Sequence, residues 1–254
     1  MTLLAVERMK LLTTRSPWWC AALALALTIG FAALMAATAD ARVPVTVGAS
    51  QFGYTFGMVV VMVMAALAIT TEYRFGTMRA TFLAAPNRTP VLFAKTAVVA
   101  LVAGVIGEVA AFGSWGITKL LAPNADLALQ TPYEWRAVAG VGLVYAVAAV
   151  LAVGVGALVR QSAGAISILL IWSFLVESLV QLIPRVGDDI HRWLPFTMAD
   201  KLITGDPDPS GRDVIYGPPP SAAALGPWPA LLYFAGVAAL VFAAAVVTTN
   251  RRDA

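Results

Sequence analysis

The sequence predicts an all-α integral membrane protein with about six transmembrane helices, and three observations support this fold class. Of the 254 residues, 60% are hydrophobic and only 12% are charged, and the mean hydropathy is +0.81. A soluble domain of this size usually carries about 25% charged residues. The apolar residues gather in six long runs, which lack the alternation of polar and apolar residues typical of a transmembrane β-strand.

Each apolar run has room for the roughly 20 helical residues that a bilayer requires. The third run is the longest, so its helix is expected to tilt or to extend beyond the hydrocarbon. The first run precedes the small residues Ala37-Thr38-Ala39, but it is longer than a typical signal-peptide core. We therefore expect one transmembrane domain over residues 1–254, with spans at approximately 17–37, 50–70, 91–117, 137–159, 164–183 and 230–249.

Lys and Arg in the short connections set the expected orientation, because cytoplasmic loops carry an excess of positive charge. Only Arg42, Lys119 and Arg136 fall in short connections on the opposite side. The connection between the fifth and sixth spans holds four more basic residues, but long loops count weakly. Both termini are therefore expected in the cytoplasm, on the side with ten of the 17 basic residues: Arg8, Lys10, Arg15, Arg74, Arg79, Arg88, Lys95, Arg160, Arg251 and Arg252.

A long outer loop, from Pro184 to Pro229, separates the last two spans. Its first half is apolar enough to lie in the membrane interface, and its second half is rich in Pro, Gly and Asp and is expected to be irregular. Asp188, Asp189 and His191 carry groups that bind metals, but no second His or Cys lies nearby. A solvated loop is therefore favoured, and no metal site is expected.

The connection between the second and third spans carries the most informative pattern. If residues 72–83 are helical, an apolar stripe and two polar stripes form at helical spacing: Phe75, Met78 and Phe82; Arg74, Thr77 and Thr81; Glu72, Gly76 and Arg79. Such a helix would lie at the membrane surface, and Pro86 and Pro90 would end it before the third span. An ordinary basic loop is the alternative, and periodicity alone favours neither interpretation.

The same connection resembles the segment after the second span of ABC-2 type permeases, the membrane subunits of bacterial ABC exporters for drugs, antibiotics and lipid-linked molecules. The residues that carry this resemblance are Glu72-Tyr73-Arg74, Gly76-Thr77, Arg79, Thr81, Pro86, Arg88 and Lys95. The N-terminal segment also resembles that family, through Glu7, Lys10, Arg15 and Ser16-Pro17-Trp18. Six spans, internal termini and a long last outer loop extend the likeness over essentially the whole chain.

The resemblance implies roles that spacing does not show. It implies an N-terminal interfacial helix, and an inner-loop helix that couples the permease to a separate ATPase subunit. The coupling residues would be Glu72, Tyr73, Arg74, Gly76, Thr77, Arg79 and Thr81. The resemblance further implies a multi-pass protein of the bacterial inner membrane, in a complex of two permease chains, identical or related, and two ATPase subunits among membrane lipids. The expected activity is export of an amphipathic, lipid-like or drug-like substrate.

ATP hydrolysis is not expected in this chain. A phosphate-binding loop requires a Gly-Lys pair before Ser or Thr, and none of the four lysines follows a glycine. We therefore expect no cofactor in this chain, with ATP and Mg²⁺ bound by the partner subunit. Scattered basic residues argue against binding to nucleic acid. A single His and a single Cys, far apart, argue against an enzyme site.

Two carboxylates lie at membrane depth, Glu108 in the third expected span and Glu177 in the fifth. A charge at the centre of a transmembrane helix costs about 2.5–3.5 kcal/mol on insertion scales, so such residues usually face protein or a wet cavity. Glu108 and Glu177 either line the substrate path or join helices as hydrogen-bonded carboxyls, for which the nearby serines are Ser114, Ser173 and Ser178. The sequence leaves both interpretations open.

An ATP-independent secondary transporter is the alternative function. It would use the two membrane carboxylates as a proton route, and an inverted repeat or broken helices in matching positions would support it. Neither feature is evident in the sequence. The ATP-driven permease is therefore the favoured hypothesis.

Overall fold

The computed structural model describes residues 3–39, 45–78, 81, 87–207 and 218–252. Within these residues all regular secondary structure is helical, which confirms the predicted fold class. Six helical segments are long and apolar enough to cross a membrane, and each overlaps one predicted span. They are Arg15–Thr38, Val47–Arg74, Arg88–Leu121, Pro132–Val159, Ser162–Val180 and Pro227–Arg251.

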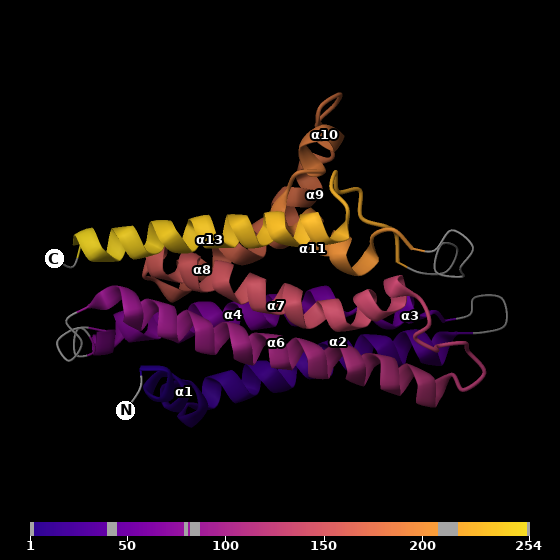
Figure 1. The fold of residues 1–254 in the computed structure, drawn as a ribbon, viewed down its shortest axis with the longest axis horizontal. Coiled ribbons are helices and arrows are strands. Elements are labelled where there is room, and N and C mark those ends of the chain that lie inside the picture. The colour runs from indigo at the N-terminus through magenta and orange to yellow at the C-terminus, as the bar shows by residue number, and fades with distance from the viewer. Residues whose placement is uncertain (1–2, 40–44, 79–80, 82–86, 208–217, 253–254) are drawn as a thin grey trace.

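The long helices lie side by side in a bundle (Figure 1). The N-terminal helix α1 (Leu3–Thr13) and the last turns of α13 (Pro227–Arg252) lie at the same end of this bundle. We call this end the inner end, because the positive-inside rule assigns its basic residues to the cytoplasm. The opposite end is called the outer end.

Helix α7 (Pro132–Val159) is the centre of the bundle, and it packs against α4 (Tyr54–Arg74), α6 (Arg88–Leu121) and α13. It begins with a capping box, in which Thr131 and Glu134 each accept a hydrogen bond from the other's backbone N–H. Helices α6 and α7 approach closely at two glycines. A Cβ on Gly107 would lie 2.8 Å from the Gly142 Cα, so any side chain there would push the helices apart.

The second and fifth spans are interrupted. Helix α3 (Val47–Ser50) precedes α4, with a short non-α-helical break between them, and α2 (Arg15–Thr38) packs against both. In the fifth span, α8 (Ser162–Ile171) continues through a π-helical segment, Trp172–Val176, into α9 (Glu177–Val180). Helices α9 and α10 (Gly187–His191) project away from the bundle (Figure 1). The fifth span therefore bends, where the sequence predicts an uninterrupted helix.

The first half of the outer loop, which the sequence predicts to lie in the membrane interface, also packs against the bundle. It forms α11 (Pro195–Thr204), which packs against α7 and α13. Phe196, Met198 and Leu202 are buried in these contacts. Their apolar character therefore serves packing within the protein, because α7 and α13 already offer an apolar surface at that depth.

The connection between α4 and α6 differs from the continuous helix expected over residues 72–83. Helix α4 ends at Arg74, and Gly76 follows with a φ of +70°, which glycine adopts without strain. Thr77, Met78 and Thr81 are again helical. Glu72 and Tyr73 therefore belong to the second span. Arg79, Phe82 and Pro86 lie outside the described residues.

Candidate functional site

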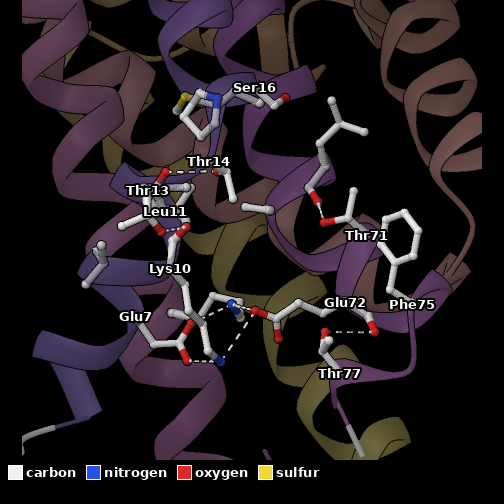
Figure 2. A pocket seen from close by; sticks show the side chains of 17 residues that line it. Glu7, Lys10, Leu11, Thr13, Thr14, Ser16, Thr71, Glu72, Phe75 and Thr77 are labelled. Carbon is white, nitrogen blue, oxygen red and sulfur yellow. Dashed lines mark hydrogen bonds and ion pairs between the residues drawn. The ribbon is translucent and has the colours of Figure 1, made fainter.

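Four charged side chains from three helices meet at the inner end (Figure 2), and we call them the inner ion cluster. Glu7 and Lys10 come from α1, Glu72 from the last turn of α4, and Lys95 from near the start of α6. The Lys95 Nζ lies 2.5 Å from Glu7 Oε2 and 2.7 Å from Glu72 Oε1. The Lys10 Nζ lies 2.8 Å from Glu7 Oε1 and 3.5 Å from Glu72 Oε1.

The inner ion cluster lies largely inside the protein. The exposed fraction is 3% for the Glu7 side chain, 4% for Lys95 and 12% for Glu72, whereas Lys10 is 34% exposed. Glu7 and Lys10 are three residues apart on α1, so they share the helix face that packs toward α6. Because charges removed from water are costly without partners, each member of the cluster depends on the others.

The surroundings keep Glu7 and Lys10 ionised. Burial by itself raises the pKa of the Glu7 carboxyl, but the ammonium groups of Lys95 and Lys10 outweigh it, so the pKa lies below its ordinary value. Burial by itself lowers the pKa of Lys10, but Glu7 and Glu72 outweigh it, so that pKa is raised. Near neutral pH, Lys95 of α6 and Glu72 of α4 therefore face charged side chains of α1.

A cavity of about 470 Å³ opens beside the inner ion cluster, between α1, the start of α2, α4 and α6. The cluster forms part of its wall, and threonine hydroxyls from α1 and α4 form another part (Figure 2). Helices α4 and α6 add an apolar wall, formed by Met64, Leu67, Ala68, Val98 and Val99. A cavity with one polar and one apolar wall suits an amphipathic molecule.

The structure separates the residues expected to contact an ATPase into two groups. Glu72 turns into the cluster, and the Tyr73 hydroxyl lies 3.4 Å from Thr249 Oγ1 of α13. The Thr81 hydroxyl accepts a hydrogen bond of 3.2 Å from Lys10 Nζ. Among the described residues of this connection, Arg74, Phe75, Gly76 and Thr77 are exposed.

The two membrane carboxylates have different surroundings. Glu108 lies on α6 against Gly142 of α7, and it makes no hydrogen bond or ion pair with any part of the chain that the structure describes. Glu177 is buried, and it accepts hydrogen bonds from the backbone N–H groups of Phe196 (2.9 Å) and Thr197 (2.8 Å). The Thr197 hydroxyl and the Trp172 indole N–H also donate to Glu177.

Glu177 thus caps the N-terminus of α11 from a different helix. The N-cap residue of α11, Leu194, has no side chain able to fill this role. None of the serines that the sequence offered as partners, Ser114, Ser173 and Ser178, contacts Glu177 by a hydrogen bond. The geometry favours the helix-joining interpretation for this residue.

Sequence reasoning missed Asp200 as a site residue. Its carboxylate accepts a hydrogen bond from the hydroxyl of Tyr54, which is the first residue of α4. The Tyr54 carbonyl in turn accepts a hydrogen bond of 2.7 Å from the Tyr145 hydroxyl of α7. Asp200 also lines a cavity of about 320 Å³ at the outer end. An isolated aspartate in a loop gives no sequence signal for such contacts.

Comparison with known proteins adds no family to these observations. No protein-family model matches the chain, and no curated protein matches its sequence. What the structure and the hydropathy together establish is a six-span, all-helical, multi-pass membrane protein.

Proposed function

We propose that this chain is the membrane-spanning subunit of an ATP-driven exporter of the bacterial inner membrane. Its substrate would be amphipathic, either lipid-like or drug-like. The inner ion cluster is the observation that carries this proposal. It joins α1, α4 and α6 at the point where the connection between the second and third spans begins.

The cluster gives a physical route from a cytoplasmic partner to the spans. A partner that moves the Arg74–Thr77 surface moves the end of α4, and with it Glu72. Moving Glu72 away from the cluster would separate its carboxylate from Lys95 and Lys10 and would leave the buried Lys95 with Glu7 alone, which is unfavourable. The three helices are therefore expected to move together, and the cavity between them is expected to change shape with them.

The partner subunits follow from this mechanism. An ATPase subunit would bind ATP and Mg²⁺ and would contact the exposed surface of Arg74, Phe75 and Thr77. A second permease chain, identical or related, would complete the path. Support for that contact comes from the projecting helices α9 and α10 and the turn between them, whose exposed apolar side chains include Leu179 at 49%, Leu182 at 74% and Ile190 at 46%.

Purification from the source cells tests the proposal. The tagged chain is expected to retain an ATP-hydrolysing subunit in mild detergent, and its ATPase activity is expected to respond to substrate. Arg74→Glu should abolish this activity, because it reverses a charge on the proposed contact surface. Lys119→Glu is the matched control, since Lys119 is also exposed but lies at the opposite end of α6.

A preparation that folds and transports without any ATPase would contradict the proposal. Equal loss of ATPase activity in Arg74→Glu and Lys119→Glu would also contradict it, because the effect would then not be specific to the inner surface.

The secondary transporter remains the second candidate, and the position of Glu108 favours it. This carboxylate lies at membrane depth and has no hydrogen-bond partner among the described residues. Transport that stops on collapse of the proton gradient, but continues after ATP depletion, would identify this mechanism. Glu108→Gln should then abolish transport, whereas an ATP-driven exporter should tolerate that change.

A further inference from the structure

We propose that the cavity beside the inner ion cluster binds a cationic amphiphile, namely an organic amine with an apolar body. The protonated nitrogen would donate hydrogen bonds to the polar wall, and the body would lie along Leu67 of α4 and Val98 of α6. As a substrate class, this proposal rests on the exporter function. As a binding site it can be tested without an ATPase.

The threonines of the cavity wall present acceptors rather than donors. Each hydroxyl has one proton and two lone pairs, and the protons are already used within the protein. Thr71 donates to the Leu67 carbonyl at 2.6 Å, and Thr14 donates to the Leu11 carbonyl at 3.1 Å. Thr13 and Thr77 likewise donate to backbone carbonyls, at 2.7 Å and 3.4 Å. Their lone pairs are what a molecule in the cavity would meet.

The two lysines of the inner ion cluster have few protons left for a ligand. The ammonium of Lys95 is buried between Glu7 and Glu72. The ammonium of Lys10 donates to Glu7 and to Thr81, and Glu72 is its third oxygen neighbour at 3.5 Å. Two of the three protons of each ammonium are thus donated within the protein, Lys95 is only 4% exposed, and Lys10 has Glu72 Oε1 as a further acceptor at 3.5 Å, so an anionic ligand would compete with carboxylates already in place.

One carboxylate oxygen of the cluster is left over. Glu72 Oε2 is buried and has no hydrogen-bond partner among the described residues, while Oε1 contacts both lysines. Figure 2 shows the Glu72 side chain extending from α4 toward Glu7 and Lys10. An unpaired buried acceptor is costly, and a turn of the Glu72 carboxylate toward a ligand donor in the cavity would remove that cost.

These observations together select the ligand's charge. The cluster itself has two carboxylates and two ammonium groups, so it imposes no strong net field on the cavity. What distinguishes ligands is then hydrogen bonding, and the wall offers more free acceptors than free donors. A protonated amine supplies two or three donors and no acceptor, whereas a carboxylate supplies only acceptors.

Photolabelling in lipid nanodiscs tests the proposal. The full chain is incubated with a diazirine-bearing dodecylamine, and the labelled peptides are mapped by mass spectrometry. Labels are expected in the peptides that contain Leu67 and Val98. Dodecylamine should compete at least about tenfold better than dodecanoate or dodecanol, since a charged hydrogen bond contributes more than a neutral one.

A pair of isosteric variants tests whether the labelling depends on the cavity wall. Thr71→Val removes one acceptor and should lower labelling about three- to tenfold, the size of one net hydrogen bond. Thr96→Val is the control, because Thr96 is buried on α6, donates to the Leu92 carbonyl at 2.8 Å and does not line the cavity. Its labelling should equal that of the unmodified chain.

Three results would overturn the proposal: equal competition by dodecanoate, labelling spread along the lipid-facing side of α6, or unchanged labelling in Thr71→Val. Different results would reject the proposed exporter function. Specific amine binding without ATP-dependent transport would keep the ligand class and reject the exporter. ATP-dependent transport without amine binding would do the reverse.

Discussion

The Lys95 Nζ lies 2.5 Å from Glu7 Oε2 and 2.7 Å from Glu72 Oε1, so one buried ammonium joins the N-terminal helix to the second span. This contact bridges residues that are 88 and 23 positions apart in the chain. Leu11 is the other residue that α1 buries, whereas Leu3, Leu4, Met9 and Leu12 on its remaining faces are exposed. Its attachment to the bundle therefore depends on the charged cluster together with one buried leucine.

Lys95→Met is expected to destabilise the protein by about 3–5 kcal/mol, the usual cost of removing one partner from a buried ion pair. Glu7 and Glu72 would then share only Lys10, whose Nζ lies 2.8 Å from Glu7 Oε1 and 3.5 Å from Glu72 Oε1. Thermal unfolding of the detergent-solubilised chain measures the effect. Lys119→Met is the control and should cost less than about 1 kcal/mol, because Lys119 is exposed. Equal losses in the two variants would show that the cluster does not hold the helices together.

The attachment of α1 is expected to weaken in acid. The pKa of Glu7 in the folded protein lies below its ordinary value of 4.5, because Lys95 and Lys10 outweigh the opposing effect of burial. A lowered pKa in the folded state means that the stabilisation is present above pH 4.5 and is lost as the pH falls through the folded pKa. Hydrogen exchange of the α1 amides should therefore accelerate below pH 4.5.

The matched variant for this experiment is Glu7→Gln, which keeps the side-chain shape and removes the titrating group. Exchange of its α1 amides should be faster at neutral pH and should change little more in acid beyond the intrinsic effect of pH. An acid response of the same size in Glu7→Gln and in the unmodified chain would assign the effect to another group.

The spans and the fold class were predictable because they depend on length and hydropathy, which are local properties. Six apolar runs predict six helices whatever their partners. The bend in the fifth span was not predictable, because Trp172–Val176 is apolar like its neighbours and no Pro or Gly marks the π-helical segment. The end of α4 at Arg74 has a signal in Gly76, which the helical periodicity of the loop obscured.

The inner ion cluster was only partly predictable. Glu7, Lys10, Glu72 and Lys95 all belong to the segments that resemble the permease family, but nothing in the sequence pairs them. Their pairing depends on how α1 folds back onto α6, which is a tertiary contact. Glu177 shows the same limit, because its partners Phe196 and Thr197 are backbone donors of a helix that the sequence assigned to the membrane surface.

The packing at the outer end is expected to weaken as the pH rises. Burial raises the pKa of Asp200 to about 7, and the charge of Glu177 adds to this effect against the hydrogen bond from Tyr54. A raised pKa in the folded state means that stability is greatest below the ordinary value of 3.8 and falls until the pH exceeds about 7. The unfolding temperature should therefore be several degrees higher at pH 5 than at pH 8.

Asp200→Asn should remove this difference, because the amide accepts the hydrogen bond from Tyr54 but does not titrate. Thermal unfolding at pH 5 and pH 8 measures both proteins in the same detergent. A pH response that survives in Asp200→Asn would show that a group other than Asp200 controls stability in this range.

Glu177→Gln is expected to loosen α11. The amide nitrogen cannot accept the hydrogen bonds that one carboxylate oxygen takes from the Thr197 N–H and hydroxyl. Loss of a helix cap costs about 0.5–2 kcal/mol. Faster hydrogen exchange of the first α11 amides measures it. Glu108→Gln is the control, and it should leave α11 unchanged, because Glu108 lies between α6 and α7.

The same two variants test the substrate path. If Glu108→Gln and Glu177→Gln both leave transport and complex assembly intact, neither carboxylate serves transport. Loss of transport in Glu177→Gln together with normal exchange of α11 would contradict the capping role and return this residue to the path.

Cross-linking tests whether the projecting helices contact a second copy of this chain. The side chain of Leu182 is 74% exposed beside α10, and that of Leu240 is 73% exposed on α13. Each is changed to Cys in a Cys20→Ser background, which removes the single native thiol. Leu182→Cys is expected to form a disulfide-linked dimer in native membranes, and Leu240→Cys is expected to stay monomeric, since α9 and α10 extend from the bundle and α13 lies along it.

Dimers in equal amounts from both variants would mean chance encounters in the membrane. A monomer from Leu182→Cys alongside an active complex would place the second permease chain on another face.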